Sequence, residues 1–360
     1  MKKIIKVMTV LCAAAMLTAC SGGSSSTATT TAAAAPAETK AAETQAAAET
    51  SAAAPAASAE TSTWPDKNVT ILLNQTAGGG SDMLTRLLAD ALGNVTGQNF
   101  VVENDTSGAS MTAYETTRNG KPDGYSIFGT NCGMLTRIAS GQYNHTLDEF
   151  TVLGLYTTPS KEGYGIYVKG DSQFETLDDL IKYDQEKPGE LITSGQTGGF
   201  VMFMEAELET RLGIQPTFVE GGSDADRILT ILGNSVDYCL LANLSARQYV
   251  ESGDLKCLAM VNDKSDLMPD VPTLSESGYE NINMSNLMLL LGPAGMSDAD
   301  VQAISAALEK ASKDTTLVEG YTKMNCVWDY QTPEESKKTL EDMYNIMVSV
   351  YPTVQAMGLG

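Results

Sequence analysis

The stretch TAGGGSDMLTRLLADAL, residues 76–92, decides the fold of this chain. It follows an apolar run at residues 69–73, and its own apolar residues recur at helical spacing up to Gly93, which stands where a C-terminal cap belongs. An anion binds favourably where a strand leads through a glycine-rich turn into the start of a helix. The first helical N–H groups there have no intrahelical partner, and the helix dipole favours negative charge. The stretch therefore predicts a turn that binds an anionic group.

The same pattern recurs at three more places. Glycine-rich or polar turns follow predicted strands at residues 125–129, 191–194 and 217–219. Ligands of open α/β sheets bind beyond the carboxyl ends of the strands, so the four turns predict a cleft between two lobes. One such turn alone would mean little, because ordinary βα turns also favour Gly and Ser. The residues expected to contact the ligand are Thr76, Gly78, Gly79, Gly80, Ser81, Asp82, Thr130, Asn131, Ser194, Gln196, Thr197, Gly198, Gly222 and Ser223.

The N-terminus has the features of a lipoprotein signal. Three early lysines precede an apolar run, residues 7–16, that is too short to span a bilayer. The following LTAC, residues 17–20, resembles a bacterial lipobox, in which the peptide is cut before the cysteine and the thiol is lipidated. Residues 21–63 are mainly Ala, Thr, Ser, Glu and Pro. We therefore expect a signal peptide at 1–20, a lipid anchor on Cys20, a disordered tether at 21–63 and an extracytoplasmic location.

Length and charge limit what the remaining residues, 64–360, can be. They exceed the size at which a single core usually stops growing, and strands alternate with helices, so two α/β lobes with parallel sheets are expected. Lobe 1 is expected at 64–166 and 290–360, and lobe 2 at 167–289. The formal net charge is −22, and the lysines of the signal offset the excess acid of the tether. This charge argues against nucleic acid and against polybasic lipid binding.

The sequence offers little for catalysis or metal binding. His145 is the one histidine, and an anchored hydrolase would need it beside a serine or a cleft carboxylate. No metal or nucleotide motif is present, so we expect no catalytic residue, no metal and no cofactor. Cys132, Cys239, Cys257 and Cys326 show no CxxC spacing, and their disulfide state stays open.

Several segments, taken in order, resemble the extracytoplasmic substrate-binding receptors of tripartite tricarboxylate transporters, the Bug-type proteins. The first turn is similar to that family's glycine-rich loop ending in Asp, and DVPT is similar to its late signature. The matching segments are 76–82, VVEN at 101–104, PDGY at 122–125, SG at 194–195, GNSVD at 233–237, DVPT at 270–273 and GPAG at 292–295.

The resemblance implies a type II periplasmic-binding-protein fold, in which two α/β lobes joined by two crossing strands close on a ligand. It also implies that main-chain amides and waters, rather than a buried arginine, hold a small carboxylate, and that a membrane permease receives it.

Ser81 is expected also to cap its helix. An amino-acid receptor on the same scaffold is the alternative, with Asp82 accepting the ammonium group. Arg137 and Arg227 are candidate charge partners or simply exposed helix cations.

Overall fold

Two β-sheets organise the chain in the computed structural model, which describes residues 62–159, 163–324 and 326–358. These residues belong to one unit of the chain, Ser58–Gly360. The expected signal peptide, Cys20 and the tether up to residue 61 lie outside the described residues. Within the described ranges, no helix combines the length and the apolar character that a membrane crossing requires.

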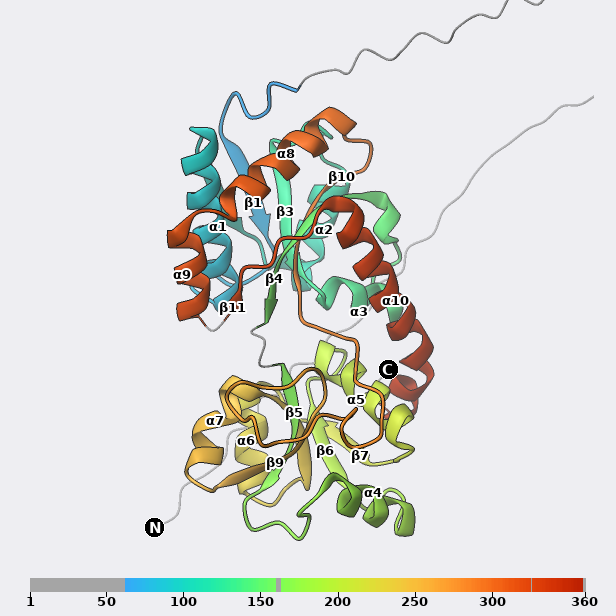
Figure 1. The fold of residues 1–360 in the computed structure, drawn as a ribbon. Helices are drawn as coiled ribbons and strands as arrows, with labels where there is room; N and C mark the ends of the chain where they lie inside the picture. The colour runs from blue at the N-terminus through green and yellow to red at the C-terminus, as the bar shows by residue number, and fades with distance from the viewer. Residues whose placement is uncertain (1–61, 160–162, 325, 359–360) are drawn as a thin grey trace, which may run out of the picture. The chain divides into compact units, whose positions relative to one another are not determined.

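The first sheet has the strand order β11-β4-β10-β3-β1-β2 (Figure 1). Strand β1 runs parallel to β2 and β3, whereas β10 is antiparallel to both β3 and β4. The expected parallel pairing is therefore present in β1, β2 and β3, but the sheet is mixed, because β10 enters from the second half of the chain in the opposite direction. The strands are β1 (Val69–Leu73), β2 (Phe100–Asn104), β3 (Ser126–Asn131), β4 (Phe150–Pro159), β10 (Met288–Pro293) and β11 (Cys326–Val327).

Helices from both ends of the described chain accompany this sheet. Near the N-terminal strands are α1 (Gly80–Thr96), η1 (Ser107–Ser110), α2 (Met111–Arg118), α3 (Gly133–Ala139) and η2 (Leu147–Glu149), and the C-terminal helices are α8 (Asp298–Ala311), α9 (Thr315–Lys323) and α10 (Pro333–Ala356). Both tryptophans of the protein lie here. Trp64 is buried in the core that includes β1 and α1, and Trp328 packs edge-on against the buried Tyr321 of α9, with ring centroids 5.4 Å apart.

The second sheet has the order β7-β6-β8-β5-β9 and is also mixed. Strand β6 is parallel to β7 and β8, and β5 is antiparallel to β8 and β9. The lobe boundaries expected at residues 166 and 290 fall inside β5 and β10. The elements are β5 (Tyr164–Lys169), α4 (Leu177–Glu186), β6 (Ile192–Gly195), α5 (Phe200–Leu212), β7 (Thr217–Glu220), α6 (Asp224–Leu232), β8 (Tyr238–Ala242), α7 (Asn243–Glu251) and β9 (Leu255–Met260).

Helix α1 forms as its apolar spacing predicts, but it ends later than expected. Leu84, Leu88 and Leu92 recur one turn apart and are buried. The C-cap is Gly97, at φ 76°, and its N–H bonds to the carbonyl oxygen of Gly93. Gly93 therefore lies inside the helix, and the placement of the cap there is wrong, because the positive φ that ends the helix occurs one turn later.

The last helix accompanies both sheets. Helix α10, red in Figure 1, packs against β4 and α3 and also against α5 of the second sheet's layer. At the second contact, Tyr351 of α10 stacks on Phe203 of α5 with ring centroids 6.3 Å apart. Helix α5 is buried along almost its whole length, and it starts at the turn that follows β6.

Candidate functional site

Turns from both sheets enclose a polar cavity of about 590 Å³. From the first sheet come the turns after β1 and β2, the end of β3 and the start of α3; from the second come the turns after β6 and β7 and the first turns of α5 and α6. The lining residues are Asn74, Gln75, Thr76, Thr106, Ser110, Tyr114, Asn131, Gly133, Thr136, Arg137, Gln142, Tyr164, Gln196, Thr197, Gly198, Gly199, Phe200, Val201, Gly222, Ser223, Asp224, Arg227 and Asn286. Its size is typical of small-molecule sites.

Arg137 supplies an uncompensated positive charge to this cavity. The chain has six arginines, all described, and five of them form ion pairs with acidic side chains. Arg137, half-buried in α3, has no acidic partner among the described residues. Its neighbour Tyr114 is 1% exposed and accepts a hydrogen bond from Asn74 Nδ2 at 3.2 Å. Burial raises the pKa of Tyr114, although the positive charge of Arg137 opposes that effect.

The second sheet contributes an arginine that is already paired. Arg227 is 3% exposed, forms an ion pair with Asp224 and donates from Nη1 to the carbonyl oxygen of Gly222 at 2.9 Å. Its Nε is buried and has no hydrogen-bond partner in the described structure. Asp224 is the one acidic residue in the cavity lining, so two arginines and one paired carboxylate leave the described lining with an excess positive charge.

Many main-chain N–H groups of the turns are already engaged within the chain. In the first turn, Gly78 N donates to Asp82 Oδ2 at 2.8 Å and Gly79 N to Thr76 O at 3.1 Å. In the second sheet, Thr197 N donates to Glu220 Oε2 at 2.8 Å, and Ser223 N donates to Asp226 Oδ2 at 3.0 Å. The turns therefore offer a ligand fewer free amides than their composition predicts, and the polar side chains and Arg137 gain importance.

The residues predicted as ligand contacts divide into two sets of equal size. Those that line the cavity are Thr76, Asn131, Gln196, Thr197, Gly198, Gly222 and Ser223. Those that do not are Gly78, Gly79, Gly80, Ser81, Asp82, Thr130 and Ser194. Within the second set, Asp82, Thr130 and Ser194 are buried, and the Ser194 hydroxyl lies 3.1 Å from Cys239 Sγ, whereas Gly78, Gly79 and Gly80 are exposed to solvent.

Asp82 organises the first turn from behind. Its side chain is 3% exposed and accepts hydrogen bonds from Gly78 N at 2.8 Å, from Asn104 Nδ2 at 2.8 Å and from Arg86 Nε at 2.9 Å. Burial alone would raise the pKa of Asp82, but these bonds and the charge of Arg86 lower it to about 2. The N-cap of α1 is Gly79 without a side-chain cap, so the expectation that Ser81 caps this helix is wrong.

Sequence reasoning missed several lining side chains. Asn74 and Gln75 directly follow β1 and precede the predicted contact Thr76, and this position at the end of a strand is a signal that could have marked them. Tyr114 and Gln142 carry no local pattern, because a helix face and an exposed loop bring them to the cavity from elsewhere in the sequence.

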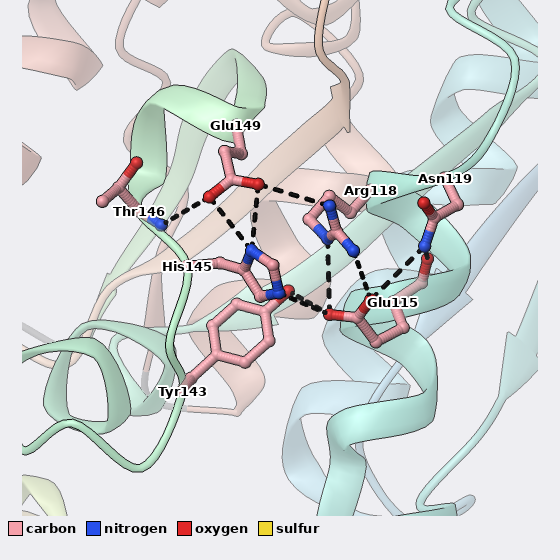
Figure 2. Close-up of polar contacts among 7 residues, drawn as sticks. All are labelled: Glu115, Arg118, Asn119, Tyr143, His145, Thr146 and Glu149. Atoms are coloured by element: carbon pink, nitrogen blue, oxygen red, sulfur yellow. Dashed lines mark hydrogen bonds and ion pairs between the residues drawn. The ribbon is translucent and has the colours of Figure 1, made fainter. Parts of the chain in front are cut away.

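His145 lies in a separate polar network, outside the cavity lining (Figure 2). Its Nδ1 is 2.9 Å from Glu149 Oε2 and its Nε2 is 3.5 Å from Glu115 Oε1. Arg118 bridges the same two glutamates, and the Tyr143 hydroxyl donates to Glu115 at 2.9 Å. Among the described residues, His145 forms its polar contacts with carboxylates and with no serine, so the network has the composition of an ion-pair cluster rather than of an acyl-transfer site.

Two other expectations concern thiols and metals. Cys132, Cys239, Cys257 and Cys326 are all free in the structure. Among the residues that the structure describes, no group of three His, Cys, Asp or Glu side chains is arranged to hold a metal ion.

Comparison with known proteins agrees with this geometry. The sequence profile described as the tripartite tricarboxylate transporter family receptor matches residues 84–346. A UPF0065 protein of Bordetella pertussis is 26% identical over 268 residues, which cover 72% of this chain and 81% of that protein. A solved TctC solute-binding protein from Polaromonas aligns with a TM-score of 0.71 at 20% identity, over 81% of this chain and 100% of that one. MatC from Rhodopseudomonas palustris, solved with bound malate, aligns with a TM-score of 0.60 at 19% identity, over 81% and 99%. These likenesses confirm the expected α/β fold of periplasmic solute-binding proteins.

Proposed function

This chain belongs to the tripartite tricarboxylate transporter receptor family, and on that basis we propose that it captures a small carboxylate in the cavity between its two sheets. The receptor then delivers the carboxylate to a membrane permease of the tripartite type. The observation that carries the proposal is Arg137, the one described arginine without an acidic partner, on the wall of a polar cavity. A guanidinium group matches the planar fork of a carboxylate and binds it through charge-assisted hydrogen bonds.

The charge of the cavity favours an anion over an amino acid. The protein carries a net charge of −22, so long-range electrostatics repel an anionic ligand, and a local positive site must compensate. An amino acid would need a free carboxylate for its ammonium group. Asp82 is buried and fully engaged behind the turn, and Asp224 is paired with Arg227. The malate bound to MatC, a protein of the same fold, is consistent with this ligand class.

Anchoring and delivery complete the proposal. Family membership supports an extracytoplasmic receptor, and the LTAC sequence at 17–20 supports a lipid anchor on Cys20. The low-complexity residues 21–63 would hold the binding unit near the permease while letting it move.

Calorimetric titration of the purified protein with malate, citrate, aspartate and nicotinate tests the ligand class. Arg137→Gln removes the positive charge, and loss of one partner of a buried charge pair costs about 2 kcal/mol, or roughly 30-fold in Kd. Arg247→Gln is the matched control, because Arg247 pairs with Glu251 outside the cavity. Tight binding of aspartate alone, or equal carboxylate affinities for Arg137→Gln and Arg247→Gln, would contradict the proposal.

A further inference from the structure

One carboxylate joins two of the turns that line the cavity. Glu220, the last residue of β7, accepts hydrogen bonds at Oε2 from Thr197 N at 2.8 Å and from the Thr197 hydroxyl. Its Oε1 accepts from Gly222 N at 3.1 Å. Thr197 belongs to the turn after β6 and Gly222 to the turn after β7, and both line the cavity, whereas Glu220 is not one of its lining residues.

The backbone brings the two turns together at the same sheet edge. Strands β6 and β7 are parallel, with Gly195 opposite Glu220, and Gly221 N donates to Gly195 O at 2.9 Å. Gly222, whose N–H donates to Glu220, then adopts φ +61°, a conformation that residues other than glycine disfavour. The carboxylate therefore closes a bridge between two turns that are already neighbours.

An acidic side chain beside an anion-binding cavity needs a reason, because its charge opposes the ligand. The hydrogen bonds supply that reason: three donors converge on one carboxylate, an arrangement that a neutral amide, with its own N–H groups, cannot satisfy equally. We propose that Glu220 is a positioning residue that sets the shape of the second sheet's half of the binding cavity without touching the ligand. The inference rests on the proposed carboxylate function of that cavity.

The charged groups that face Glu220 come from α6, and residues 196–199 of the other turn contain no titratable side chain. Arg227 is close enough to favour the ionised form of Glu220, Asp224 is paired with Arg227, and Asp226 bonds to Ser223. The hydrogen bonds from Thr197 are the largest cause that holds the pKa of Glu220 below its ordinary value. Glu220 is exposed, so bulk pH controls the bridge directly.

The first experiment measures, in the absence of ligand, how well Glu220 protects the two amides that it holds. Glu220→Gln should speed amide hydrogen exchange at Thr197 and Gly222 about fivefold, as expected from the loss of a hydrogen bond to a charged group at an exposed position. Glu175→Gln, which removes an exposed acid paired with Lys256, is the matched control and should leave both amides unchanged. Unchanged exchange in Glu220→Gln would overturn the inference, whatever the protein binds.

Malate titration then separates positioning from direct contact. We expect Glu220→Gln to weaken malate about fivefold at neutral pH, and the ratio of mutant to wild-type Kd to approach one as pH falls and Glu220 takes up a proton. Thr197→Val should add no further loss in the Glu220→Gln background, whereas a full additional loss would make Thr197 a direct ligand contact and overturn the inference. If wild-type protein binds none of the tested carboxylates, the proposed function fails, and the exchange measurement still decides whether the bridge exists.

Discussion

Replacing Asp82 with Asn should destabilise the fold rather than simply weaken ligand binding. Asp82 is buried, and its carboxylate accepts hydrogen bonds from Gly78, Asn104 and Arg86. Its pKa is lowered from 3.8 to about 2, and at ~1.4 kcal/mol per pKa unit this corresponds to about 2.4 kcal/mol of stability at neutral pH. Asn cannot accept from all three donors, so Asp82→Asn should lose about that amount.

The pH dependence gives the sign of this effect. The pKa of Asp82 is depressed in the folded state, so its stabilisation is complete well above 3.8 and is lost as pH falls toward about 2. The difference between wild type and Asp82→Asn should therefore be largest at pH 7 and should fall to about half by pH ~3.

Urea unfolding followed by circular dichroism at pH 7, 4 and 3 measures both quantities. Asp90→Asn, an exposed acid on the same helix, is the control and should change the free energy of unfolding by less than about 0.5 kcal/mol. Equal stability of Asp82→Asn and wild type at pH 7 would refute the assigned role, and so would a difference that does not depend on pH.

Two further changes test the cavity rim and the buried acids. Gly198 has φ +66°, and a Cβ there would lie 3.2 Å from Gln142 Nε2, so Gly198→Ala should weaken malate binding severalfold. Gly213→Ala is the control, because Gly213 has φ +65° but no atom within 4 Å of the added Cβ. It should cost about 1 kcal/mol of stability and leave the affinity for malate unchanged. Burial, together with the charges of Glu205 and Asp184, raises the pKa of Glu209 to about 9. As pH rises from 5 to 9, the unfolded chain releases the Glu209 proton before the folded protein does, so the wild-type protein loses stability over that range. Glu209→Gln should remove this loss and gain at least ~2 kcal/mol on wild type over that range in urea unfolding, and parallel stability curves for the two proteins would contradict the assignment.

Much of the fold could be predicted from the sequence, because its strands are short apolar runs bounded by turn residues. Predicted strands such as residues 69–73 and 217–219 agree with β1 and β7 to within one residue. Helix α9 is not among the expected helices, although Leu317 and Tyr321 recur one turn apart and are buried, because its nine residues form only a short apolar pattern. The antiparallel entry of β10 was also missed, because strand direction depends on where the chain crosses between sheets and not on local pattern.

The candidate site was predictable as a set of turns but not as a surface. Composition identifies turns that can approach a ligand, and those after β6 and β7 do line the cavity. It does not show which amides the chain uses for itself: Asp82 and Glu220 each take up N–H groups that appeared free in the sequence. Arg137 was one of two candidate cations, with Arg227, and only its lack of an acidic partner among the described residues, which is a tertiary property, distinguishes it.

The position of both tryptophans beside the first sheet has an experimental consequence. Trp64 and Trp328 pack around β1, α1 and α9, whereas the second sheet's elements contain only tyrosine and phenylalanine as aromatic side chains. Indole fluorescence is thus an optical reporter of one half of the molecule, while far-ultraviolet dichroism averages over both. Melting curves from the two probes would coincide if the halves unfold as a single cooperative block, and they would separate if α10 fails to couple them.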